Sequence, residues 1–326
     1  MNSTIRSVAA VTSSAAAVLV GSVALSAQAT IDAENRYPNV GAVMVWRVDD
    51  SGKPVELRGF ASGTLIRPRV MITAGHFTAP VKALGQIPPT LRIFASFSPT
   101  DARDPATWIP VIAAATHPSM PHCPPPPQCD PTDEVLVAPL EPGIADAGLV
   151  FLERAPTNIQ PAVLAAPGTL GRSEGARTTI VGYGLTSPRR ALAPSVDASP
   201  WDGKRRVRSS VVRRIVDETW GLWSIPSYVC SGDSGGGIFL TGPSSRADER
   251  LVANVSDGGQ DCRRHNNNNR LDTRAIQKWI DDTADGSGAG MPHRACFANA
   301  SPILRPSAEV FACARCSTQW MSYSAL

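Results

Sequence analysis

Apolar and β-branched residues recur along the middle of the chain in short runs, separated by turns rich in glycine and proline. Alternation at this spacing is typical of antiparallel strands. The first set of runs covers residues 41–48, 59–66, 70–73, 91–97, 108–114 and 146–152. The second set covers residues 178–182, 207–216, 236–240 and 251–256. The pattern predicts an all-β fold in which each set closes into an antiparallel barrel.

The end of the chain has a different pattern. Residues 273–282 have the periodicity of an amphipathic helix, and residues 285–290 have the composition of a flexible linker. We therefore expect a folded domain over residues 30–283, followed by a linker and a cysteine-containing tail over residues 284–326. Within the domain, we expect the asparagine run at 266–269 to form a flexible turn.

The N-terminus is typical of an export signal. Arg6 precedes a short apolar run, and Ala27-Gln28-Ala29 has the A-x-A form of a cleavage site. A membrane anchor is the alternative, but the apolar run is short and diluted by serine. We expect residues 1–29 to be a signal peptide and the mature protein to be extracellular or periplasmic, with no membrane association after cleavage.

Charge adds little to this picture. The formal net charge of the 326-residue chain is +3, which favours no nucleic-acid partner. The basic run at 204–208 and the pair Arg213-Arg214 can be interpreted as a polyanion patch or as the solvated face of a strand with its loop, and the second interpretation is favoured. We expect a monomer.

Seven cysteines in an exported chain favour disulfides over free thiols. Cys123 and Cys129 flank four prolines in an expected surface loop and are candidates to close it. With His117 and His122 they can also be interpreted as a metal site, but the spacing matches no zinc pattern. Cys296, Cys313 and Cys316 leave one thiol of the tail without an intrachain partner. We expect no metal and no cofactor.

The candidate chemistry centres on Ser234. It lies within Cys230-Ser231-Gly232-Asp233-Ser234-Gly235-Gly236-Gly237, where small residues allow a tight turn that exposes the hydroxyl and points backbone N–H groups at one spot. A glycine-rich surface turn is the alternative for an isolated match.

A serine hydroxyl needs a histidine to accept its proton and a carboxylate to orient that histidine. His76 follows the apolar run 70–73, and Asp146 begins the run 146–152, so each candidate stands at the end of a predicted strand. An α/β-hydrolase elbow shares the pattern around Ser234, but it requires a helix after the serine and a later histidine. The glycines at 235–237 favour a strand instead.

Taken together, these segments resemble the trypsin/chymotrypsin-type serine proteases, and among them the secreted bacterial members. Thr-Ala-Gly-His at 73–76, the Asp146 segment, Gly-Tyr-Gly at 182–184, Gly-Asp-Ser-Gly-Gly at 232–236, Val-Ser-Asp-Gly at 255–258 and the terminal segment 272–280 occur in the family's order. The resemblance covers residues 37–282. It implies two six-stranded antiparallel barrels, a C-terminal helix and a catalytic site in the cleft between the barrels.

The resemblance also implies site roles: a catalytic triad, an oxyanion hole, a bridge bracing the specificity pocket, and a substrate-binding strand that pairs with a peptide. The implied triad is His76, Asp146 and Ser234, and the N–H groups of Gly232 and Ser234 are expected to form the oxyanion hole. The implied bridge joins Cys230 to Cys262. The substrate-binding strand contains Ser256, which is expected to hydrogen-bond near Asp146, and continues through the backbone of Gly258. Tyr228 stands where a trypsin-like member has an aspartate on the pocket floor. The implied activity is endopeptidase action on a protein or peptide substrate, and a non-catalytic homologue is the alternative.

In the family, the aspartate before the serine is buried and pairs with an N-terminal ammonium released by cleavage. Asp233 therefore needs a cationic partner. Because the chain has no activation sequence of the usual form, signal-peptide removal before Thr30 is expected to supply the ammonium, or else an internal Arg or Lys takes its place.

Overall fold

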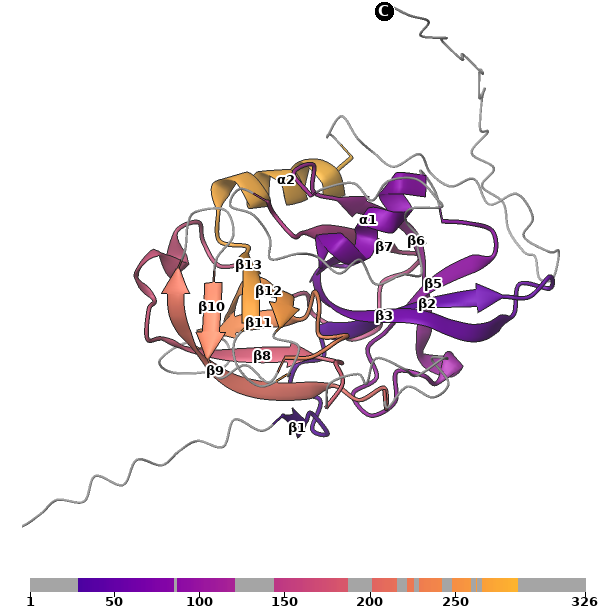
Figure 1. Cartoon of the computed structure of the whole chain (residues 1–326), viewed down its shortest axis with the longest axis horizontal. Coiled ribbons are helices and arrows are strands. Elements are labelled where there is room, and N and C mark those ends of the chain that lie inside the picture. The colour runs from indigo at the N-terminus through magenta and orange to yellow at the C-terminus, as the bar shows by residue number, and fades with distance from the viewer. Residues whose placement is uncertain are drawn as a thin grey trace, which may run out of the picture.

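The structure, a computed structural model, describes residues 29–84, 87–120, 144–186, 201–215, 222–225, 229–241, 248–258, 262 and 266–286. Two β-structures lie side by side, the first formed by the indigo and purple half of the chain and the second by the pink and orange half (Figure 1). Antiparallel pairing runs through both.

The first β-structure is a closed barrel with the strand order β2-β3-β4-β7-β6-β5. Its strands are β2 Val40–Val48, β3 Pro54–Arg67, β4 Val70–Thr73, β5 Leu91–Ser96, β6 Trp108–Thr116 and β7 Gly148–Leu152. Alternate residues face its interior, where Val43, Leu65, Met71, Ile93 and Leu152 belong to one buried cluster.

The second β-structure is a sheet with the order β1-β9-β10-β13-β12-β11-β8. Its strands are β1 Thr30–Ile31, β8 Arg177–Gly182, β9 Arg206–Ile215, β10 Leu222–Ile225, β11 Gly237–Leu240, β12 Arg250–Gly258 and β13 Asn266–Arg270. Because β8 pairs with β9 as well as β11, the six strands other than β1 form a closed ring. Strand β1 pairs with the start of β9.

Both faces of several strands are buried, which explains runs without alternation. All four residues of β4 are buried. Met71 faces the interior of the first barrel, whereas Ile72 belongs to the cluster at the junction with the second sheet, together with Val181 and Phe239. The site lies at this junction.

Two α-helices are described, α1 Gly75–Leu84 and α2 Arg274–Ala284, with 3₁₀ turns at Pro105–Thr107 and Thr169–Arg172. Thr273 caps α2, because its hydroxyl accepts from the Ile276 N–H. Helix α2 follows the second sheet but reaches back to the first barrel, where Arg67 at the end of β3 pairs with Asp281 and Asp285. Neither helix in these ranges has the length and apolar content needed to cross a bilayer.

The predicted fold class is confirmed, and the predicted runs coincide with strands to within a few residues at most ends. Helix α1 was not predicted, because Pro80 lies within it and the sequence there argues against a continuous helix. The expected turn at 266–269 is wrong: these asparagines form β13, paired on both sides with β10 and β12. Residues 1–28 of the predicted signal peptide, the Cys123–Cys129 loop and the three tail cysteines lie outside the described residues.

The expectation of a solvated basic strand and loop is confirmed for Arg213 and Arg214, which are exposed, but it is wrong for three arginines around the start of β9. Arg205, Arg206 and Arg208 are all buried. Each has its own carboxylate: Arg205 Nε lies 3.0 Å from Asp32, Arg206 Nη2 2.5 Å from Asp202, and Arg208 Nη2 2.9 Å from Asp233. Burial of these arginines is possible because each charge is paired.

Candidate active site

The end of β4 brings His76 to Asp146. The backbone approach is very close at Gly75, where a Cβ would lie 2.9 Å from the Ala147 nitrogen and 3.1 Å from Asp146 Oδ1. This closeness lets the His76 N–H donate to Asp146 Oδ1 at 2.7 Å, while His76 Nδ1 lies 2.8 Å from Oδ2. Two contacts between the same residues fix the imidazole relative to the carboxylate.

Strand β12 supplies a further donor to this carboxylate. The Ser256 hydroxyl donates to Asp146 Oδ2 at 2.5 Å, so the contact that the family resemblance implies is present. Burial alone would raise the pKa of Asp146, but the His76 charge and the hydrogen bonds from His76 and Ser256 outweigh burial and hold this pKa below its usual value. Asp146 is therefore a buried, ionised orienting group for His76.

The loop carrying Ser234 is held against the same strand end. A Cβ on Gly235, the next residue, would lie 2.4 Å from Thr73 Oγ1 and 2.6 Å from the Ala74 nitrogen. With φ at +81°, Gly235 also has a backbone that residues with side chains rarely adopt. The loop therefore contacts Ala74, which lies two positions before His76 in the chain. Ser234 is partly exposed.

Hydrogen bonds pin this loop to both halves of the molecule. The Ser62 N–H in β3 donates to the Ser234 carbonyl at 2.9 Å, and the Ser62 hydroxyl donates to the Gly232 carbonyl at 2.8 Å. On the other side, the Gly235 N–H donates to the Val255 carbonyl at 2.7 Å. Sequence reasoning missed Ser62, whose only signal was its position in a predicted strand.

Gly232 cannot carry a side chain here. Its φ is +91°, and a Cβ would lie 2.0 Å from Phe60 Cε2. Within the described part of the chain, the N–H groups of Gly232 and Ser234 donate to no protein acceptor. Both groups are therefore available to an external acceptor beside the serine.

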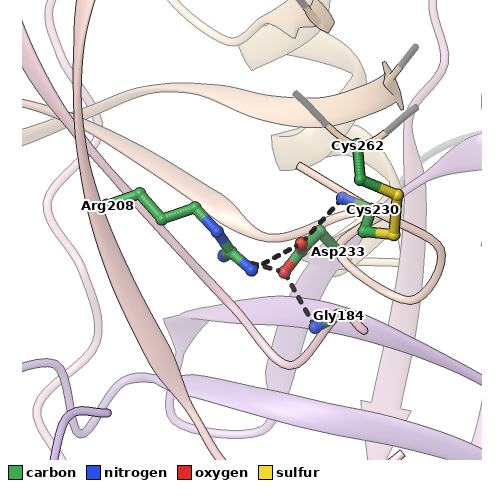
Figure 2. The surroundings of a disulfide bond; sticks show 5 residues. All are labelled: Gly184, Arg208, Cys230, Asp233 and Cys262. Carbon is green, nitrogen blue, oxygen red and sulfur yellow. Dashed lines mark hydrogen bonds and ion pairs between the residues drawn. A yellow bond between two sulfur atoms is a disulfide. The ribbon is translucent and has the colours of Figure 1, made fainter. Parts of the chain in front are cut away.

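Asp233 is buried between the disulfide and β9 (Figure 2). It accepts from the N–H groups of Gly184 at 2.8 Å and Cys230 at 3.0 Å, and Arg208 faces both of its oxygens. The expected pairing with an N-terminal ammonium is therefore not what the structure shows. An internal arginine, the alternative considered from the sequence, neutralises Asp233.

The Cys230–Cys262 disulfide implied by the resemblance is confirmed. Gly258 lies at the end of β12, paired with Asn266 of β13. On the opposite edge the β11 ladder ends at Asn254, so the backbone of residues 256–258 extends beyond it. Tyr228 lies outside the described residues.

No group of three His, Cys, Asp or Glu side chains that could hold a metal occurs among the described residues. The alternative metal site includes His122, Cys123 and Cys129, which lie outside them. A strand, β11, and not a helix follows Ser234, which excludes the α/β-hydrolase elbow.

Comparison with known proteins finds likeness to solved structures. Human heparin binding protein has a TM-score of 0.51 at 15% identity, and a mutant of it 0.52 at 14%, each over 80% of this chain and 98% of that chain. GrC, a granzyme, has a TM-score of 0.50 at 16% identity, over 79% of this chain and 98% of that chain. No family model and no curated protein matches. The fold is that of the chymotrypsin-type serine proteases, and these neighbours give no support to a bacterial-like subtype.

Proposed function

We propose that this chain is an exported serine endopeptidase that hydrolyses peptide bonds through an acyl-enzyme intermediate. The observation that carries the proposal is a histidine held by two hydrogen bonds to a buried ionised carboxylate, with the loop of a partly exposed serine packed against the strand end just before that histidine. The resemblance in sequence and the fold likeness both support it.

In the proposed mechanism, Ser234 Oγ attacks the scissile carbonyl while His76 Nε2 accepts the hydroxyl proton. Asp146 orients the ring through Nδ1 and stabilises the imidazolium. The N–H groups of Gly232 and Ser234 stabilise the oxyanion. His76 then protonates the leaving amine, the C–N bond breaks, and water hydrolyses the acyl-enzyme by the same steps with His76 as base.

The substrate class proposed is an extended peptide or a protein segment. The backbone of residues 256–258 continues past the end of the β11 ladder, so a peptide can pair with it as an added strand. The Cys230–Cys262 disulfide suits an oxidising compartment, which supports export, as does the A-x-A signature at residues 27–29.

A non-catalytic binding protein is the second candidate. It is favoured by one observation, that a neighbour with the same fold is named for binding heparin. Against it stands the retention of His76, Asp146 and Ser234 in this chain, together with the hydrogen bonds from His76 and Ser256 to Asp146.

An active-site-directed fluorophosphonate probe separates the two candidates. We expect stoichiometric labelling of the wild type and none of Ser234→Ala. Ser231→Ala, a change to the serine three residues earlier in the same loop, is the matched control and is expected to label normally. An unlabelled wild type that is folded and carries the Cys230–Cys262 bond would exclude the proposed enzyme.

A further inference from the structure

Asn254 and Asn269 form an amide pair beside Asp146 that the proposed mechanism does not use. They are directly opposite each other in β12 and β13, and both side chains are fully buried. Asn269 Nδ2 donates to Asn254 Oδ1 at 3.0 Å, and Asn254 Nδ2 donates to the Asp146 main-chain carbonyl at 3.1 Å.

The orientation of the Asn254 amide follows from its two partners. A carbonyl oxygen can only accept, so the Asn254 nitrogen faces Asp146. Asn269 donates to the Asn254 oxygen from the other side and thereby opposes a flip of the amide. The pair thus presents one fixed donor to Asp146.

Asn254 and Ser256 belong to the same strand and hold different parts of Asp146. Ser256 Oγ donates to the carboxylate, whereas Asn254 donates to the main-chain carbonyl. Asp146 lies just before β7 of the first barrel, and β12 belongs to the second sheet. The two contacts therefore tie the carboxylate of one half to the substrate-facing strand of the other.

Stability alone does not explain an amide pair at this position. Asparagine is unfavourable in strands, and Asn269 Oδ1 is buried without a hydrogen-bond partner among the described residues. Asn254 does satisfy the Asp146 main-chain carbonyl, but that hydrogen bond does not require an amide at position 269, where an apolar side chain would avoid the unpaired oxygen. A buried polar network kept at this cost fixes one arrangement of the groups that it contacts.

We propose that Asn254 is a positioning residue for Asp146, held in its orientation by Asn269. The effect of Asn254 on catalysis rests on the proposed function, whereas the effect of Asn254 on the His76–Asp146 hydrogen bond does not. Without the Asn254 donor, Asp146 shifts relative to Ser256 and His76, and the imidazole loses its fixed direction.

Kinetics give the first test. In Asn254→Leu, kcat per titrated active site is expected to fall about 10- to 100-fold with KM within about twofold, because displacement of a catalytic group by a fraction of an ångström slows chemistry more than binding. In Asn269→Leu, kcat is expected to fall by a smaller factor. The double variant, which leaves neither amide of the pair in the core, is expected to be no slower than Asn254→Leu, because the pair acts as one unit.

Val252→Ala is the matched control, since Val252 lies on the same strand in the apolar core of the second sheet. It loses stability but is expected to keep kcat. Equal kcat values for Asn254→Leu and Val252→Ala would overturn the proposal. Should Asn254→Leu not fold, the double variant, which leaves no amide of the pair behind, provides the same comparison.

The His76 Nδ1 proton gives a readout that needs no turnover. Its NMR resonance, in the hydrogen bond to Asp146, is expected to move upfield or broaden in Asn254→Leu and to be unchanged in Val252→Ala. An unchanged resonance in Asn254→Leu overturns the positioning role even in an active enzyme. A changed resonance in a chain that the fluorophosphonate probe does not label upholds the positioning role and rejects the proposed function.

Discussion

At the residue scale, the site depends on a few close approaches that tolerate no larger side chain. Gly75 lets the backbone of His76 reach Asp146, and Gly235 lets the serine loop reach β4. Gly182 and Gly184 make room for Asp233 in the same way, since a Cβ on either would overlap its carboxylate. Each of these contacts in the site therefore requires a glycine at that position.

The first prediction concerns the proposed triad. Ser234→Ala and His76→Ala are each expected to lower kcat by about 10⁶-fold, and the double variant is expected to be hardly slower, because nucleophile and base act as one unit. Asp146→Asn is expected to cost on the order of 10⁴-fold, because the amide favours the wrong histidine tautomer. Turnover of a peptide ester per mole of folded protein measures all four. Additive losses in the double variant would contradict the assignment.

The second prediction concerns primary specificity. By the family resemblance, Tyr228 is expected to stand where a trypsin-like member has an aspartate, so substrates with P1 Lys or Arg are not expected to be preferred over apolar P1 residues. A peptide library varied at P1 measures the preference. A strong preference for Arg would mean that another carboxylate, such as Asp257, reaches the pocket.

The third prediction concerns the Arg208–Asp233 pair. Arg208→Met leaves a buried carboxylate without its cation, so the free energy of unfolding is expected to fall by about 3–5 kcal/mol. Because Asp233 lies between Gly232 and Ser234, kcat is expected to fall as well. Denaturant unfolding and titrated kinetics measure the two effects.

The control for this pair is the double variant Arg208→Met/Asp233→Asn, which removes both charges and is expected to recover part of the lost stability. A single variant Arg208→Met with wild-type stability and kcat would show that the N–H groups of Gly184 and Cys230 suffice for Asp233.

At the element scale, the short strand β1 holds the N-terminal segment against the second sheet. Thr30 and Ile31 pair with Val207 and Arg206, and the next residue, Asp32, is buried against Arg205. Arg205 also donates to the carbonyls of Val40 and Phe97. The N-terminal segment is thus part of the junction between the two halves.

The fourth prediction follows from this arrangement. Variants extended by a few residues before Thr30 are expected to keep full kcat, because Arg208 and not a terminal ammonium neutralises Asp233. Deletion through Asp32 is expected to destabilise the fold, because it leaves Arg205 buried without its carboxylate. N-terminal sequencing with kinetics and thermal unfolding measures both.

Asp32→Asn separates loss of the charge from loss of the strand, since it keeps β1 and removes the ion pair. An extended form that is inactive until it is trimmed to Thr30 would restore the ammonium mechanism and contradict the prediction.

At the scale of the whole molecule, the two halves meet through buried polar groups as well as apolar ones. The Tyr183 hydroxyl donates to the Ser98 carbonyl at 2.8 Å and lies 3.3 Å from Arg205 Nη1. Burial raises the pKa of Tyr183 to about 12, with Arg205 opposing the rise. The junction therefore favours the neutral phenol.

The fifth prediction is a loss of stability at high pH. The folded state raises this pKa above its ordinary value of 10.0, so the stabilisation is complete below pH 10 and is lost as the pH rises toward 12. Two pH units correspond to on the order of 3 kcal/mol. Denaturant unfolding of the wild type and of Tyr183→Phe at several pH values measures this loss. The free energy of unfolding of the wild type is expected to fall more steeply with pH than that of Tyr183→Phe. Parallel curves would contradict the prediction.

Local pattern and residue chemistry were enough to predict the fold class and the candidate site. Alternation and turn residues predicted the all-β fold and all strands but β1, β10 and β13, and the loop at 230–237 with His76 and Asp146 predicted the candidate site. These signals lie within short segments, so they need no knowledge of distant neighbours. The Ser256 contact was implied by the family resemblance.

Other features depend on what packs against a segment, and they could be seen only in the folded chain. Residues 266–269 are strand because β10 and β12 bind their backbone on both sides, against the preference of asparagine. Arg208 is buried because Asp233, 25 positions away in sequence, meets it. The amide of Asn254 faces Asp146 from 108 positions away, which no local pattern specifies. Charges and amides are placed by partners that come together only in the folded chain, and those partners hold the site in shape.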